Sequence, residues 1–301
     1  MPASSVSYDP RVQRARMAAR RRQRRRRKLA RRLAGLLCLA CGALWLLAAG
    51  AAPRAPMSAA GTLARPADGQ AGAWDSDTRA ALEALVQTQP QVQAMLDQPG
   101  RWPAEVAALL ARNAEALDFV LAYPDIKDDA PPQTVGEVQQ GTLPQLLQWD
   151  QRWGAASYGG GILAVTGCGP TALSMVACGL TGDGTLTPAR IAAWADARGY
   201  AGAGGTSWEM MYAGCEAFGL RAEEIPLTES AVYGALEAGR PIICSVRPGD
   251  FTTVGHFIVL AGVQDGRLRV LDPNSPARSA QAWDYQRLEP QIKALWAYDA
   301  A

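Results

Sequence analysis

The stretch Gly167-Cys168-Gly169-Pro170-Thr171-Ala172-Leu173 is the part of this 301-residue chain that best indicates its fold. Pro170 suits the first turn of a helix, because its missing N–H would have no partner there in any case. We therefore expect a helix that begins at Cys168 and runs to about residue 179. A helix N-terminus favours the thiolate, the nucleophilic form of cysteine. The flanking glycines are expected to allow a tight entry turn and close approach of a substrate carbonyl. The alternative interpretation is a buried cysteine in a core helix.

The chain contains one histidine, His256, so any mechanism that needs an imidazole base has to use it. His256 follows Gly255 and opens the apolar run Phe257-Ile258-Val259-Leu260. This pattern predicts that His256 lies at the start of a strand, where its side chain can face a cleft. A structural histidine is the alternative interpretation.

The hydrophobic period changes from helical to strand-like along the C-terminal half. Thr206 and Glu209 have the spacing of a capping box at the head of a helix that continues to about residue 218. Helices first and strands later indicate an α+β domain. The expected elements are helices at 168–179, 188–198 and 206–218, and strands at 241–246, 256–263 and 267–271, the last two joined by a turn at Gln264-Asp265-Gly266.

Acyl transfer also needs a group that orients the base and a donor that holds the oxyanion. Asp272 lies sixteen residues beyond His256, at the far end of the expected hairpin, where adjacent strands bring the two side chains together. Its carboxylate would hold the imidazole in the correct tautomer, although Asp before Pro is also a common turn former. The oxyanion donors would be the Cys168 N–H and a side-chain amide, and Gln148 and Gln151 are both candidates.

Four motifs in this order resemble those of the C39-like peptidases, relatives of the bacteriocin-processing peptidases within the papain-like group. They are Gln148-x-Asp150-x-Arg152-Trp153, Gly-Cys-Gly-Pro-Thr-Ala-Leu at 167–173, Gly-His-Phe-Ile-Val-Leu at 255–260 and Asp-Pro-Asn-Ser at 272–275. The resemblance covers about residues 143–298. It implies a papain-like cysteine peptidase fold, with N-terminal helices and a C-terminal antiparallel sheet, that needs no cofactor.

The resemblance also implies a role for each matching residue. By this match Cys168 is the nucleophile, His256 the general base and Asp272 its orienting partner. Gln148 takes the oxyanion position because it opens the first motif. The substrate would be a peptide or protein.

The N-terminal region has an uneven charge distribution. Thirteen of the 30 basic residues lie between Arg11 and Arg32, and the chain from Leu33 onward carries 17 basic and 27 acidic residues. No aromatic residue is interleaved with the arginines, so nucleic acid is not an expected partner. The basic block runs into the uncharged stretch Leu33 to Ala52, whose twenty residues suffice to cross a membrane as a helix. Because arginine-rich flanks stay in the cytoplasm, we expect a single pass with the catalytic domain on the outer face. The alternative is a signal peptide and a secreted protein.

The sequence therefore predicts five segments with different compositions. Pro, Gly, Ala and Ser dominate the stretch after the apolar run, and helical periodicity follows it. The helical subdomain would either cover the catalytic domain or space it from the membrane. The segments are a basic cytoplasmic tail (1–32), a transmembrane helix (33–52), a flexible linker (53–75), a helical subdomain (76–130) and a C39-like cysteine peptidase domain (131–301).

The remaining cysteines are not expected to take part in chemistry. Cys38 and Cys41 lie within the apolar span. Cys178, Cys215 and Cys244 have apolar neighbours that are typical of core positions, although an outer-face location would permit a disulfide between two of them.

Three functions are consistent with these features. The first is a membrane-anchored cysteine peptidase that acts on a peptide or protein outside the membrane. The second is an amidase or transpeptidase that acts on cell-wall peptides through the same cysteine, histidine and aspartate. The third is a non-catalytic surface binding module in which Cys168 is structural.

Overall fold

The computed structural model describes residues 74–202 and 205–301. The predicted basic tail, apolar span and most of the linker lie outside these residues. Within the described residues, no helix is both long enough and apolar enough to cross a membrane. All described residues belong to one compact unit, residues 66–301.

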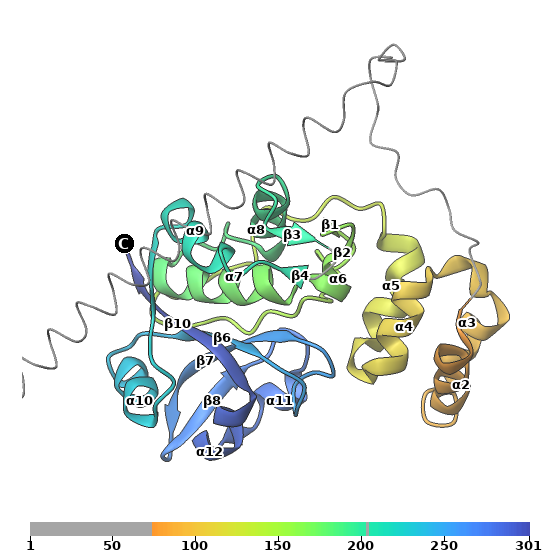
Figure 1. Ribbon diagram of the computed structural model, residues 1–301. Helices are drawn as coiled ribbons and strands as arrows, with labels where there is room; N and C mark the ends of the chain where they lie inside the picture. Colours follow the sequence, from red (N-terminus) through yellow and green to blue (C-terminus); the bar gives the residue numbers. More distant parts are fainter. Residues whose placement is uncertain (1–73, 203–204) are drawn as a thin grey trace, which may run out of the picture. The chain divides into compact units, whose positions relative to one another are not determined.

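Residues 76–126, orange to yellow in Figure 1, form a group of short helices around their own apolar core. Leu82, Val106 and Phe119 are among the side chains that this core buries. The helices are α2 (Ser76–Leu85), α3 (Gln93–Asp97), α4 (Ala104–Arg112) and α5 (Leu117–Ile126), with 3-10 turns η1 (Pro90–Val92), η2 (Pro99–Arg101) and η3 (Ala114–Ala116) between them.

The rest of the unit is built on a six-stranded antiparallel sheet in the order β5-β10-β6-β7-β8-β9. The three predicted strands are present as its central members, β6, β7 and β8. The bounds are β5 (Leu220–Glu224), β6 (Ile242–Val246), β7 (His256–Gln264), β8 (Arg267–Leu271), β9 (Ala282–Trp283) and β10 (Ile292–Ala300).

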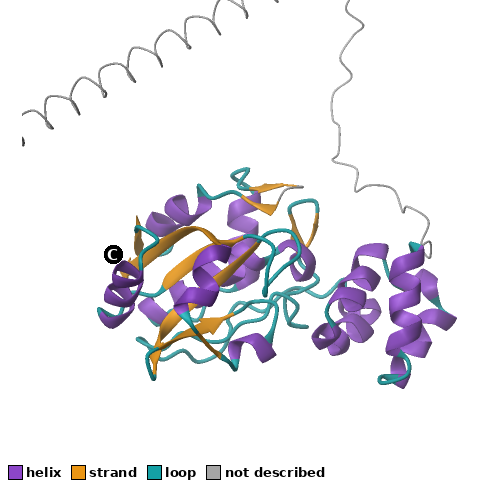
Figure 2. Cartoon of the chain, turned by 60° about the horizontal axis from the view of Figure 1, so that its bottom comes forward, coloured by secondary structure: helices purple, strands orange, loops and turns teal. Residues whose placement is uncertain are grey.

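Helices cover both faces of this sheet (Figures 1 and 2). One face packs against the helix that begins at Cys168, and the other packs against α10 and α12. The helices are α6 (Leu163–Thr166), α7 (Cys168–Thr181), α8 (Pro188–Asp196), α9 (Met210–Ala217), α10 (Glu229–Glu237), α11 (Pro276–Ser279) and α12 (Tyr285–Leu288), with a 3-10 turn η4 (Glu289–Gln291). Two small hairpins complete the unit: β1 (Ser157–Tyr158) with β2 (Gly161–Ile162), and β3 (Ala201–Gly202) with β4 (Gly205–Thr206). The prediction of an α+β fold is confirmed.

Helix α7 is the central helix of the domain, and its sequence explains both of its ends. It starts at Cys168 with Gly167 as its N-cap, and it ends where Gly182 adopts a left-handed conformation with φ of 74°. The residues between are almost entirely buried, so the helix serves as a core element while its first residue stays partly exposed. The fold therefore presents Cys168 at the end of a rigid support.

Candidate active site

Cys168 lies where the sequence places it, as the first residue of α7. Its thiol is partly exposed, whereas the other three cysteines among the described residues are buried. A partly exposed sulfur at a helix N-terminus is available for chemistry and lies where a negative charge is favoured.

The glycines on either side of Cys168 are required by packing. A Cβ on Gly167 would collide with the carbonyl and side chain of Leu163, and one on Gly169 would collide with the side chain of Thr206. Neither glycine has a positive φ. Packing within the protein therefore requires both glycines, and a larger residue at either position would break these contacts.

Thr206 does not cap a helix, so that prediction was wrong. Helix α9 begins at Met210, and the Thr206 hydroxyl lies 2.8 Å from the hydroxyl of Tyr158. Burial and the nearby Cys168 sulfur raise the pKa of Tyr158 to about 12, despite the hydrogen bond from Thr206 that lowers it. The pair fills the space beside Gly169, and nothing in the local sequence pattern of either residue predicts it.

His256 is the first residue of β7 and is 7% exposed. Its Nε2 lies 2.7 Å from Oδ1 of Asp272. An ionised carboxylate can only accept a hydrogen bond, so Nε2 of His256 carries a proton. Nδ1 is then the ring nitrogen that can interact with the Cys168 thiol. Burial alone would lower the pKa of His256, but the Asp272 carboxylate and then the Cys168 sulfur outweigh burial and raise it to about 10. The Asp272 carboxylate thus favours the protonated form of the imidazole.

Asp272 follows directly after β8 and is completely buried. Besides His256, its Oδ1 accepts the N–H of Asn274 at 2.7 Å, and its Oδ2 accepts Nε of Arg278 at 2.5 Å. Burial would raise the pKa of this carboxyl, but His256 and Arg278 together hold it below its usual value. Arg278, on α11, is a partner of the Asp272 carboxylate that the sequence did not reveal. An arginine six positions after an aspartate is no recognisable signal by itself.

The hairpin between His256 and Asp272 turns at Asp265-Gly266, both with positive φ, as a two-residue turn requires. Next to this turn Gly262 pairs with Arg269. If that register continued to the end of the hairpin, Asp272 would lie opposite Val259. Side chains alternate along a strand, so Asp272 and His256 would then lie on opposite faces of the sheet.

A β-bulge at Ala261 corrects this mismatch. The ladder shifts by one residue there, and Gly262 has a φ of 156°, a conformation that other residues rarely adopt. In the shifted register Asp272 comes opposite Ile258, two positions from His256 and therefore on the same face. Without the bulge, the spacing in the sequence would place His256 and Asp272 on opposite faces of the sheet. The bulge places them on the same face.

The two glutamines that the sequence left as alternatives differ in the structure. Gln148 is 3% exposed, and its Nε2 donates to the carbonyl of Ala164, in α6 just before Cys168, at 2.8 Å. Gln151 is exposed, and its Nε2 donates instead to the carbonyl of Asp118 on α5 at 3.0 Å. Only Gln148 therefore has its amide beside the turn that leads into Cys168. Its Oε1 has no hydrogen-bond partner among the described residues.

Cys178, Cys215 and Cys244 are free thiols in the core, so no disulfide joins them. Burial raises the pKa of the Cys178 and Cys215 thiols to about 11, and it raises that of Cys244 well above its usual value. These thiols stay protonated and unreactive. Cys38 and Cys41 lie outside the described residues.

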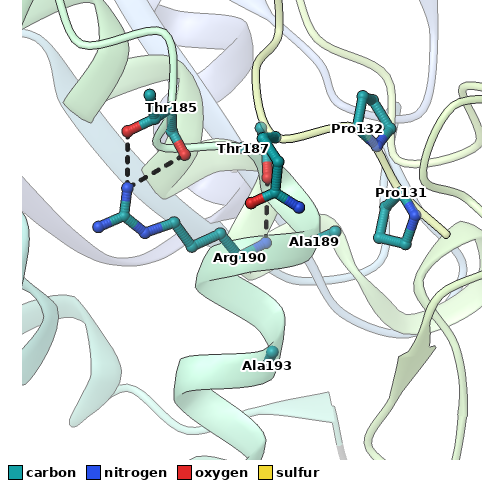
Figure 3. A pocket seen from close by; sticks show the side chains of 8 residues that line it. Pro131, Pro132, Thr185, Thr187, Ala189, Arg190 and Ala193 are labelled. Carbon is teal, nitrogen blue, oxygen red and sulfur yellow. Dashed lines mark hydrogen bonds between the residues drawn. The ribbon is translucent and has the colours of Figure 1, made fainter.

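A surface pocket lies beside the start of α8 (Figure 3). It is lined by the stretch Pro131 to Gln133 and by the start of α8, where Arg190 donates to the hydroxyl of Thr185 at 2.6 Å. None of the predicted site residues lines it.

The chain belongs to the Peptidase_C39 like family, whose model matches residues 142–300, more than half of its length. It is therefore a cysteine peptidase of the C39-like kind. The prediction of this family, made from the four motifs, is confirmed.

Two solved structures are similar to this chain. The peptidase domain of Streptococcus ComA, a bifunctional ABC transporter involved in a quorum sensing pathway, is 20% identical, with 45% of this chain and 91% of that chain covered and a TM-score of 0.37. A putative C39-like peptidase from Bacillus anthracis is 16% identical, with 55% and 98% covered and a TM-score of 0.35. Among curated proteins no relative matches.

Proposed function

We propose that Cys168, His256 and Asp272 are the catalytic triad of this peptidase and that it cleaves a peptide or protein through an acyl-enzyme on Cys168. The observation that carries the proposal is the buried hydrogen bond of 2.7 Å between His256 and Asp272, on an imidazole that also interacts with the Cys168 sulfur. A cysteine at a helix N-terminus that faces a histidine on a strand is the arrangement expected of a papain-like peptidase.

In the first half of the reaction the Cys168 thiolate attacks the carbonyl carbon of the scissile bond, and the electron pair moves to the carbonyl oxygen. When the tetrahedral intermediate collapses, the His256 imidazolium gives its proton to the leaving amine and the C–N bond breaks. In the second half His256 takes a proton from water, the hydroxide attacks the thioester, and Cys168 leaves as the thiolate. Asp272 keeps the imidazole oriented throughout.

The oxyanion is assigned to the Cys168 N–H and the Gln148 amide. Gln148 donates one of its two N–H groups to Ala164 and has a second one to give. Two fixed donors at the place where charge develops are worth about 3 kcal/mol or more each when the site excludes water. Gln148→Ala should therefore slow turnover while leaving the nucleophile reactive toward small electrophiles.

For location, we propose that Leu33 to Ala52 anchors the chain in a membrane with residues 74–301 on the outer side. The support is the uncharged length of this stretch and its arginine-rich N-terminal flank. A membrane-impermeant thiol reagent should then label Cys168 in intact cells. Labelling that requires cell lysis would contradict the proposed orientation, and a shortened intact mass would indicate a cleaved signal instead.

The main test is the alkylation rate of Cys168 in the full-length protein between pH 5 and 9, with mass spectrometry to locate the adduct. A free thiol with a pKa of about 8.5 reacts slowly at pH 6, whereas a thiolate paired with an imidazolium reacts fast. The buried Cys178 and Cys244 serve as internal controls. We expect selective labelling of Cys168 at pH 6 that is lost in His256→Ala.

Two results would contradict the triad. One is labelling of Cys168 no faster than that of a free thiol, which favours a surface binding module. The other is residual turnover in a correctly folded Cys168→Ala protein. If the triad is active but cuts only cell-wall peptides, the amidase or transpeptidase alternative replaces the peptidase with the same residues.

A further inference from the structure

The position of the Asp272 carboxylate depends on the loop that follows it, residues 272–279. Asn274 and Arg278 both donate to the carboxylate from this loop. Arg278 is placed by α11, and Ser275 caps that turn by accepting the Arg278 N–H at 3.1 Å. The Asp272 N–H in turn donates to the Ser279 hydroxyl at 2.8 Å. A shift of this loop would therefore move the carboxylate away from His256.

One side of the loop is held by residues of the peptidase domain. Gln145 donates to the carbonyl of Asp272 at 3.0 Å, the Gln148 N–H donates to Pro273 at 2.7 Å, and the Trp149 indole donates to Asn274 at 3.2 Å. The segment that carries Gln148 is thus hydrogen-bonded to the loop that carries Asp272.

The other side of the loop is held by the helical segment, residues 76–126. Nδ2 of Asn113 lies 2.8 Å from the carbonyl of Asn274 and 3.1 Å from its side-chain oxygen. Both carboxylate oxygens of Glu115 accept from the loop, Oε1 from the Ser275 hydroxyl at 2.5 Å and Oε2 from the Ala277 N–H at 2.9 Å. Hydrogen bonds to a charged acceptor are about twice as strong as neutral ones.

Asn113 and Glu115 act as one unit, because the Asn113 side chain accepts the Glu115 N–H at 3.1 Å and starts the η3 turn. The same helical segment also packs against α6, the short helix that precedes Cys168. Its apolar core includes Trp149 and Ala164, and a Cβ on Gly154 would lie 2.7 Å from the ring of Phe119. The family model begins at residue 142, so Asn113, Glu115 and Phe119 lie outside the region that the family shares.

We propose that Glu115 and Asn113, in the helical segment 76–126, are positioning residues that hold the 272–279 loop and so keep Asp272 on His256. This inference rests on the triad of the proposed function and adds a part that the triad does not contain. The sequence left two roles open for this segment, covering the catalytic domain or spacing it from a membrane. The proposal favours the first, since the segment contacts the loop that holds Asp272.

The test compares Cys168 alkylation at pH 6 in three full-length variants. Glu115→Ala removes both acceptors. Asn113→Asp keeps the cap on the Glu115 N–H but replaces the donor to Asn274 with an acceptor. Asp118→Asn is the matched control, because Asp118 is exposed on the next helix and its side chain does not contact the loop. We expect about a tenfold slower rate for the first two and no change for the control, since displacements near 1 Å can cost up to about a hundredfold.

A second measurement separates positioning from simple loss of stability. His256 is the only histidine, so a protein labelled with 15N at histidine reports its protonation through a single imidazole. In Glu115→Ala the titration midpoint should fall toward the ordinary value while the fold remains intact by circular dichroism. Glu115→Gln, which keeps one acceptor oxygen, should lie between the wild-type protein and Glu115→Ala.

The outcomes distinguish the two proposals. If the wild-type protein labels rapidly but Glu115→Ala and Asn113→Asp match it in rate and in titration, the positioning role is wrong and the triad stands. If the wild-type Cys168 itself labels like a free thiol, the proposed function fails and the positioning role fails with it. Slower labelling together with a shifted His256 titration supports the inference.

Discussion

The nucleophile side and the base side of the site are built in different ways. Cys168 is placed mainly by its own stretch of chain, because α6 leads into α7 and Gly167 packs against Leu163, while Thr206 packs beside Gly169. His256 and Asp272 come from two strands joined by a bulged hairpin, and they depend on Arg278 and on a loop held from both sides. One side is local, and the other is assembled from distant parts of the chain.

This difference predicts where the site is vulnerable. The base side buries an imidazole, a carboxylate and part of a guanidinium together: Asp272 raises the pKa of His256, and His256 and Arg278 lower the pKa of Asp272. Removing one member of such a group leaves an uncompensated buried charge, which is strongly destabilising. On the nucleophile side a change alters only its immediate neighbours. The three predictions below test this comparison, from the largest expected effect to the smallest.

Asp272→Asn should slow Cys168 alkylation by about a hundredfold, less than the complete loss expected for His256→Ala. The amide keeps the shape of the side chain but removes the charge that holds His256 protonated and leaves Arg278 unpaired. The control is Asp284→Asn, which breaks an exposed ion pair with Arg267. A rate for Asp272→Asn that equals the control would remove Asp272 from the site.

The Cys168→Ala protein should lose stability as pH rises above about 6.5, the ordinary pKa of histidine. Asp272 raises the pKa of His256, so above that pH the folded chain keeps a proton that the unfolded chain has released. The stabilisation is complete at lower pH and is lost as pH approaches the folded pKa, by about 1.4 kcal/mol per pH unit for one proton. The alanine variant removes the Cys168 thiol, so that His256 and Asp272 are the ionisable groups of the triad that remain.

Urea unfolding between pH 6 and 9 measures this slope. The matched comparison is Cys168→Ala with Asp272→Asn added, in which the cause of the raised pKa is gone and the slope should be small. Equal slopes in the two proteins would mean that Asp272 does not control the proton on His256.

Gly262→Val should lower the free energy of unfolding by about 1–3 kcal/mol, because φ near 156° is unfavourable for a β-branched residue. No atom lies within 4 Å of a Cβ built there, so the cost comes from the backbone alone. Deleting Ala261 in the same protein removes the extra residue of the bulge. The ladder then becomes regular, Val259 still pairs with Leu271, and stability should be restored. A double variant as unstable as Gly262→Val would contradict this account of the bulge.

Much of the fold could be predicted from the sequence, and the failures have physical causes. β6, β7 and β8 were recognisable because apolar runs end at clear turn residues. β10 was missed because residues 294–298 are all buried and show no alternation, and because no turn residues follow them as they follow β6. β5 was missed for the opposite reason, since three of its five residues are charged and mostly exposed. The Thr206 cap was wrong because a tertiary partner, Tyr158, takes its hydroxyl.

The sequence by itself determined the family, and it named Cys168 and His256 as the candidate reactive pair. A single histidine leaves one imidazole base, and a cysteine between glycines at a helix start is a local signal that needs no knowledge of the rest of the chain. Only the tertiary structure decided that the Gln148 amide donates to Ala164 in α6, before Cys168, that a bulge turns Asp272 onto the face of His256, and that Arg278 completes its partners. It also brought Asn113 to Asn274 across 161 residues of sequence. These features depend on contacts between distant segments, which folding brings together and which no local spacing encodes.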